Sequence, residues 1–237
     1  MNDVKNVRSE IEKLYPDLVK FTKKNDLEFF SIFFTTKLNS IEKKPRSVEI
    51  STELKLHRSY SLFQKEISII KDKFEQGKSL LMHLSKNISD RDFLLRDLAI
   101  HHLHLSDFLK NNHKTKRTDE LLLIHISDHC VYFIDIATHD ELFKKGHRKR
   151  TVFLEIIDMN WPHILKPYIM NNLPVPDKGH DFTDDEKAEL LANGGCVMFS
   201  VNGKVLSPPG GSSTTSGAYL RALDLASNLR AKLFGVR

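Results

Sequence analysis

Cysteine is scarce in this chain, and no apolar run is long enough to cross a membrane. The 237 residues include two cysteines, Cys130 and Cys196, each inside an apolar, strand-like run. We expect two buried thiols rather than a disulfide, as is typical of the cytoplasm. The longest apolar stretches, such as residues 121–126, have the length of a strand. The charged first residues lack the apolar segment of a signal peptide, so we expect a cytoplasmic protein that does not bind membranes.

Internal repeats and low-complexity tracts are also absent, whereas positive charge is plentiful. Hydrophobic residues make up 40% of the chain, enough to bury a core, and the formal net charge is +5. Two basic runs, residues 110–117 and 144–150, flank an apolar β segment. Such runs suit a polyphosphate partner, but they are also typical of solvated loops.

Hydrophobic periodicity predicts an α+β protein in three parts. Residues 1–46 form a helical N-terminal region, in which helix 27–38 carries four phenylalanines and should be buried. Residues 47–150 form an α/β module: a strand over 47–56, a helical hairpin over 61–75 and 78–88, and strands over 99–105, 120–127 and 130–138. Residues 151–237 form a C-terminal appendage with a β-hairpin around Asn202–Gly203 and a terminal helix over 218–233.

The order of a strand, a helical hairpin and three antiparallel strands resembles that of RelE-type toxins, over about residues 47–145. The segments LRDLAIHHLHL and ISDHCVYFIDIATHDELF resemble the family's first sheet strand and its last hairpin. RelE-type toxins are small messenger-RNA endonucleases, some of them ribosome-dependent. The resemblance therefore implies an antiparallel sheet, an RNA substrate that can be ribosome-bound mRNA, and an antitoxin protein as partner.

Residue by residue, the resemblance points to histidines. The family's two lysines on the first strand of the sheet fall on His102 and His104, and the basic residue after its last strand falls on His139. Two positions depart from the family: its arginine at the start of the middle strand falls near Glu120, and its C-terminal aromatic matches Phe143, which has no hydroxyl.

A second resemblance is to HEPN ribonucleases. Arg96, Asp97 and His101 have the spacing of the motif of that family, which is all-helical. Here the segment that contains His101 alternates like a strand, which favours an accidental match. Both families cleave RNA.

Strand geometry places His102 and His104 on one face, with His101 on the other, towards the core. His139 follows a different strand and joins the pair only if the strand register allows. Metal-free RNA cleavage needs a base for the 2′-hydroxyl, an acid for the leaving 5′-oxygen and a cation for the phosphorus centre, and histidine can supply each of them. The sequence therefore predicts a catalytic set of His102, His104 and His139, with no cofactor or metal.

Three alternatives remain open at this level. The histidines can be an exposed polar strand face, a three-imidazole metal site, or contacts of a non-catalytic nucleic-acid-binding or protein-interaction module. The loop 207–217 is either a connector or a phosphate contact. The residues expected to bind RNA lie in the two basic runs: Lys114, Lys116, Arg117, Lys144, Lys145, Arg148, Lys149 and Arg150.

Overall fold

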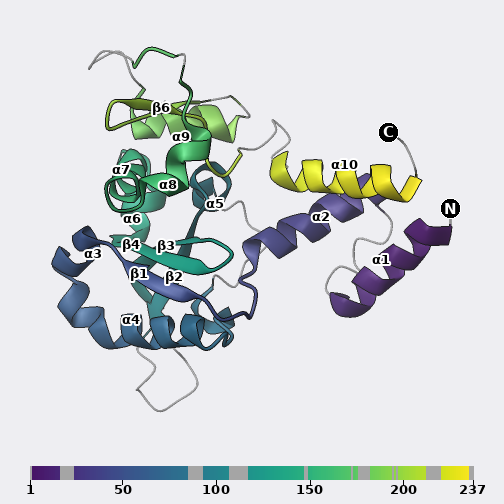
Figure 1. Cartoon of the computed structure of the whole chain (residues 1–237), viewed down its shortest axis with the longest axis horizontal. Coiled ribbons are helices and arrows are strands. Elements are labelled where there is room, and N and C mark those ends of the chain that lie inside the picture. The colour runs from purple at the N-terminus through teal and green to yellow at the C-terminus, as the bar shows by residue number, and fades with distance from the viewer. Residues whose placement is uncertain are drawn as a thin grey trace.

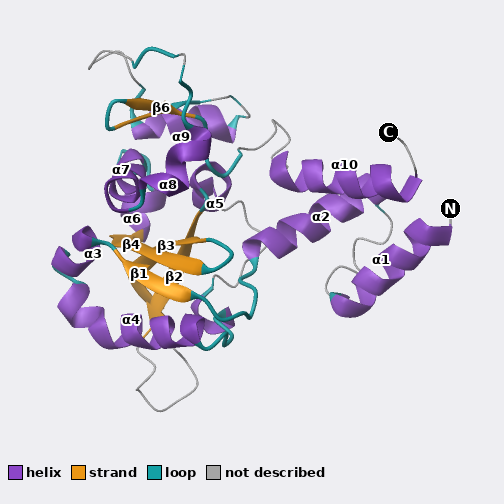
Figure 2. Ribbon diagram, in the orientation of Figure 1, coloured by secondary structure: helices purple, strands orange, loops and turns teal. Residues whose placement is uncertain are grey.

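The computed structural model describes residues 2–16, 24–84, 93–106, 117–146, 149–171, 173–175, 182–193, 195, 197–211 and 220–234. It confirms the α+β class: helices cover both faces of a four-stranded sheet, and a two-stranded sheet lies beyond one of these helical layers (Figures 1 and 2). Among these residues, no helix has both the length and the apolar character to span a membrane. Cys130 is a buried free thiol, and Cys196 lies outside the described residues.

The first and last helices of the chain pack together beside the sheet (Figure 1). They are α1 (Asn2–Leu14), α2 (Asp26–Asn39) and α10 (Leu220–Phe234). The phenylalanine-rich helix expected in the N-terminal region is α2, and Phe29 and Phe30 are fully buried in a core that includes Ala226 of α10. The terminal helix therefore joins the N-terminal helices in space.

The central sheet is mixed, with strand order β1-β4-β3-β2. Its strands are β1 (Ser47–Ile50), β2 (Ile100–Ser106), β3 (Arg117–Ile126) and β4 (Cys130–Thr138). The three strands β2, β3 and β4 are antiparallel as predicted, but β1 pairs with β4 in parallel. The expectation of a wholly antiparallel sheet is therefore wrong at β1, whose orientation is set by the helices that connect it to β2.

The strand expected over 47–56 is half helix, because β1 ends at Ile50 and α3 (Thr52–Leu56) follows. Ser51 caps α3: its buried hydroxyl accepts a hydrogen bond from the backbone N–H of Leu54 at 2.9 Å. Leu54 is fully buried below the sheet. A buried cap therefore overrides the alternating pattern of this segment.

One sheet face is covered by α4 (Tyr60–Glu75), which buries Phe63, Ile67, Ile70 and Phe74. The helical spacing predicts Ile67, Ile70 and Phe74 on this face, but it also predicts Leu62, which is exposed, in place of Phe63. We call this side the α4 core. The prediction of a second helix over 78–88 is wrong for residues 78–84, where only the 3-10 turn η2 (Leu81–His83) forms. Residues 85–88 lie outside the described residues. The side chain of His83 is fully buried, and it bonds to the backbone of His104 in the edge strand β2.

The other face is covered by the short helix before β2 and by the elements that follow β4 (Figure 1). These are α5 (Phe93–Leu98), α6 (His139–Phe143), α7 (Thr151–Asn160), α8 (Pro162–Leu165), η3 (Lys166–Tyr168), α9 (Asp184–Ala192), β5 (Phe199–Val201) and β6 (Lys204–Leu206). We call this side the α7 core. The structure confirms the hairpin around Asn202–Gly203, where both residues have positive φ.

A β-bulge interrupts the pairing of β3 with β4. Ile124 pairs with Phe133, but its neighbour Leu123 pairs with Asp135, so Ile134 is an extra residue in β4. Side chains beyond the bulge therefore change faces: Ile134 and Ala137 both belong to the α7 core, whereas Phe133 and Ile136 belong to the α4 core. The carbonyl of Ile134 accepts a hydrogen bond from the buried Ser51 hydroxyl.

Ser51→Ala should destabilise the protein by about 1–3 kcal/mol, since it removes both the cap of α3 and the hydrogen bond to the bulge. Urea unfolding would measure this loss. Ser47→Ala is the control, because the exposed hydroxyl of Ser47 bonds to the His129 carbonyl in the same strand region. An equal effect of the two substitutions would show that the buried position of Ser51 does not matter.

Candidate functional site

The structure brings the three predicted histidines together. The ring centroids of His102 and His104 are 6.2 Å apart, and those of His104 and His139 are 5.4 Å apart. Phe143, at the end of α6, lies 5.6 Å from His102 and 6.1 Å from His139 by the same measure. We call His102, His104 and His139 the histidine cluster.

The cluster lies where β2 and β4 meet α6, at the margin of the α7 core. The His104 residue is 3% exposed and His102 is half-buried, whereas 41% of the His139 side chain is exposed. The interpretation of an exposed polar strand face therefore does not fit His104. One partly exposed imidazole, that of His139, lies beside a buried one.

A carboxylate orients His139. Its Nδ1 lies 3.1 Å from the backbone oxygen of Asp119 and 3.1 Å from the Asp119 carboxylate. Both partners are acceptors, so Nδ1 carries a hydrogen and donates hydrogen bonds to them. In the neutral ring, Nε2 then holds the lone pair. The sequence did not point to Asp119, which lies opposite His139 only after the bulge has shifted the register by one residue.

The start of α6 holds His139 in place through a capping box. The Thr138 hydroxyl accepts from the N–H of Glu141, and the Glu141 carboxylate accepts from the N–H of Thr138. Partial burial would raise the pKa of Glu141, but hydrogen bonds from Lys149 and Thr138 outweigh it and lower this pKa to about 2. Glu141 is therefore ionised at neutral pH, with Lys149 Nζ 2.6 Å away.

His83 supports the backbone of His104 from the edge of the sheet. Its Nδ1 donates to the His104 carbonyl at 3.1 Å, and its Nε2 lies 3.1 Å from Lys73 Nζ. Burial lowers the pKa of His83 to about 4, against the smaller upward effect of the hydrogen bond to His104. His83 is therefore neutral at pH 7, with its proton on Nδ1 and its Nε2 free to accept from Lys73.

Three of the lysines expected to bind RNA are described, and each is exposed with an acidic neighbour. Lys144 pairs with Asp140 at 2.7 Å, Lys145 with Glu189 at 2.6 Å and Lys149 with Glu141 at 2.6 Å. Exposed pairs of this kind are weak and open readily. Lys114, Lys116, Arg148 and the side chain of Arg117 lie outside the described residues, so their role stays a prediction.

Arg150 does not present its charge to solvent, which corrects its assignment to the RNA-binding set. Its side chain is 3% exposed and donates from Nη1 to the carboxylate of Asp97, itself 1% exposed, at 2.9 Å. A buried, paired guanidinium would have to break this ion pair to reach a phosphate. Arg150 therefore joins α5 to the start of α7.

Two other interpretations of the sequence are not supported by the geometry. Arg96 and Asp97 lie on α5, which ends at Leu98, while His101 lies on β2, so the HEPN-like spacing does not fall on one helix. Within the described part of the chain, no three histidine, cysteine, aspartate or glutamate side chains are arranged to hold a metal ion. The histidine cluster thus does not have the geometry of the three-imidazole metal site.

Comparison with known proteins adds no relative. No protein-family model matches this chain, and neither curated proteins nor solved structures give a significant match. The function must therefore be argued from the site.

His83→Gln should make the protein's stability less sensitive to acid. The pKa of His83 is about 4 when folded and near its ordinary 6.5 when unfolded, so the unfolded chain binds more protons between these values. His83 thus lowers the free energy of unfolding as the pH falls from 6.5 to about 4, by up to about 1.4 kcal/mol per pH unit. A glutamine amide retains a donor for the His104 carbonyl but does not titrate.

Urea unfolding at several pH values between 4 and 7 would test this. His129→Gln, an exposed histidine in the turn between β3 and β4, is the control. Burial also lowers the pKa of His125, so the stability of every variant should remain partly sensitive to acid. If His83→Gln and His129→Gln follow the same pH profile as the unmodified protein, His83 is not the buried neutral group described here.

Proposed function

We propose that this protein is a metal-independent endoribonuclease of toxin or phage-defence type, which cleaves RNA in the cytoplasm by histidine acid–base chemistry. The observation that carries the proposal is the exposed His139 ring, held by Asp119 through Nδ1 and lying 5.4 Å from buried His104. A base with an orienting carboxylate beside further imidazoles is an arrangement suited to proton transfer.

Each histidine then has a distinct role. His139 is the base that removes the 2′-hydroxyl proton through Nε2. His102 is the acid that protonates the leaving 5′-oxygen. His104 is buried beside each of these two rings, and it positions both and adds polar support at the phosphorus centre. The 2′-oxygen attacks the phosphorus, the 5′-oxygen leaves, and a 2′,3′-cyclic phosphate forms.

RNA as the substrate is supported by charge and by the resemblance to RelE-type toxins. The chain carries a net charge of +5, and the exposed Lys144 and Lys145 follow α6, a few residues from His139. Their weak pairs with carboxylates can exchange for RNA phosphates. The described residues contain β1, α4 and the antiparallel strands β2, β3 and β4 in this chain order, but they lack the second helix of the hairpin that the resemblance implies. The resemblance to RelE-type toxins extends the proposal to ribosome-bound mRNA as substrate and to an antitoxin as partner.

His139→Gln, His102→Ala and His104→Ala should each lower RNA cleavage by about 10²-fold or more, because the first two remove groups that act in proton transfer and the third removes the imidazole that positions them. RNA binding should weaken much less. Cleavage by the unmodified protein should persist in EDTA and yield 2′,3′-cyclic phosphate ends. Gel assays with labelled RNA would measure rate and product, and filter binding would measure affinity.

His129→Gln controls for the loss of a histidine, and circular dichroism checks that His104→Ala still folds. Asp119→Asn tests the orienting contact, and it should lower the cleavage rate and alter its pH profile. Cleavage at the unmodified rate in all three histidine variants would rule out catalysis by these histidines. RNA binding without cleavage by the unmodified protein would instead indicate a non-catalytic RNA-binding module. Activity lost in EDTA and restored by zinc would indicate a metal enzyme.

Replacing Lys144, Lys145 and Lys149 together by glutamine should reduce the salt dependence of RNA binding by about one unit of log–log slope per lost phosphate contact. Lys71→Gln is the matched control, since Lys71 pairs with Glu75 on the exposed side of α4. Fluorescence anisotropy across a salt series would give both slopes. Equal slopes for the triple variant and the unmodified protein would indicate that these three lysines belong to an ordinary solvated loop that does not contact RNA.

A further inference from the structure

A cavity of about 330 Å³ lies where the N- and C-terminal helices meet the sheet. It is formed by the C-terminal end of α2, the loop that leads to β1, the start of β2, the end of β3, η3 and the start of α10. Figure 1 shows α2 running from the helical cluster to the sheet. Small-molecule sites in proteins span about 300–1,000 Å³, so this cavity has room for a small ligand.

Positive charge dominates the cavity wall. Lys37 of α2 and Arg221 of α10 line it from two different helices, together with the imidazoles of His101 and His125. Among the described residues, no carboxylate pairs with Lys37 or Arg221. Glu42 is the one acidic side chain in the described lining, and it is 75% exposed and lies 3.6 Å from Arg46. Lys37 and Arg221 are both exposed to solvent, so their charged groups are accessible to a ligand that enters the cavity.

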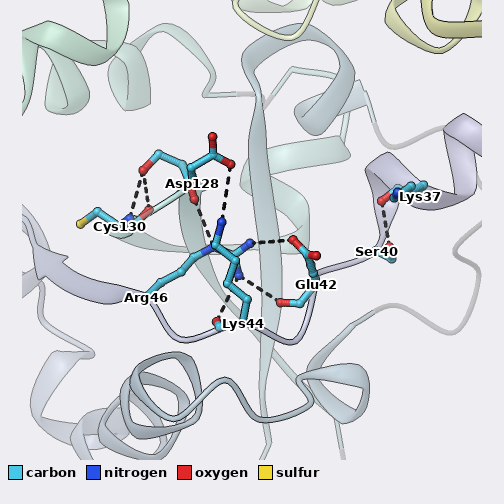
Figure 3. A network of polar contacts seen from close by, with 8 residues as sticks. Lys37, Ser40, Glu42, Lys44, Arg46, Asp128 and Cys130 are labelled. Carbon is cyan, nitrogen blue, oxygen red and sulfur yellow. Dashed lines mark hydrogen bonds and ion pairs between the residues drawn. The ribbon is translucent and has the colours of Figure 1, made fainter.

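Arg46 makes one wall of the cavity rigid. Its buried guanidinium donates to the carbonyl oxygens of Ser127 and Glu42 at 3.1 and 3.0 Å, and Figure 3 shows it held between Glu42, Lys44 and the turn before Cys130. These bonds join the loop after α2 to the β3–β4 turn. The wall is therefore formed before any ligand binds, which reduces the entropy lost on binding.

The remaining lining combines an oriented imidazole with apolar surface. His125 Nδ1 donates to the carbonyl of Ala99 at 3.0 Å, which fixes the ring orientation. Burial lowers the pKa of His125, and the charge of Arg221 adds to this effect. Tyr168 and aliphatic side chains such as Ile41 supply the apolar part. An anionic group attached to a flat, less polar body would match both halves of the cavity.

We propose that this cavity binds a phosphate monoester carried by a nucleotide, with Lys37 and Arg221 contacting the phosphate oxygens and Tyr168 contacting the nucleoside. Arginine and lysine are the side chains that proteins use most for phosphate, and a dianion balances their two charges. The nucleotide can be a free nucleoside monophosphate or the 5′-phosphorylated end of an RNA. The cavity lining does not include His102, His104 or His139, and the proposed binding does not depend on the proposed cleavage activity.

Isothermal titration calorimetry on the full chain would test the site with inorganic phosphate, nucleoside monophosphates and the matching nucleosides. Monophosphates should bind more tightly than nucleosides. Lys37→Gln and Arg221→Gln should each weaken monophosphate binding on the order of tenfold, as expected for loss of a charged hydrogen-bond donor. Lys232→Gln, an exposed lysine at the other end of α10, is the matched control and should leave affinity unchanged.

Two trinucleotides distinguish the sources of the phosphate. Both carry 2′-O-methyl groups, so they resist cleavage, and one has a 5′-phosphate whereas the other has a 5′-hydroxyl. Binding of the phosphorylated trinucleotide alone assigns the site to RNA ends, and binding of monophosphates alone assigns it to free nucleotides. The proposal is overturned if nucleosides bind as well as monophosphates, or if neither Lys37→Gln nor Arg221→Gln changes affinity. Because binding is the readout, this result is independent of whether the protein cleaves RNA.

Discussion

The hydrogen bond from the Ser51 hydroxyl to the Ile134 carbonyl supports the feature on which the candidate site depends, the bulge in β4. Next to the β3–β4 turn, Ile126 pairs with Val131, and in that register His139 would lie opposite Thr118 on the α4 side of the sheet. The extra residue moves His139 to the side of His102 and His104. A bulge leaves backbone groups without ladder partners, and here Ser51 and the Asp135 side chain supply them.

Burial decides which charged and titratable groups can act and which ones stabilise the fold. Arg150 and Asp97 neutralise each other inside the α7 core, and His83 is held neutral behind β2. His139, by contrast, keeps an exposed ring and an exposed carboxylate partner. Removal of water raises the cost of charge, so Arg150, Asp97 and His83 stabilise the fold, whereas the partly exposed ring of His139 stays accessible from solvent.

Much of the local structure could be predicted because it depends on neighbouring residues. Helix α4 follows the spacing of its apolar side chains, and the turn at Asn202–Gly203 uses two residues that tolerate positive φ. Helix α3 could not be predicted, because its cap is stabilised by a strand more than 80 residues away. The burial of Arg150 likewise depends on Asp97, 53 residues earlier in the chain.

The sequence by itself determined that His102 and His104 share a face, because side chains alternate along any strand. It also determined the α+β class and the burial of α2, since both follow from the period and amount of apolar residues. Only the tertiary structure decided that His139 and Asp119 join this face, that β1 runs parallel to β4, and that α10 closes a basic cavity with α2. Register shifts, strand order and helix docking depend on contacts between distant residues, which periodicity along one chain does not encode.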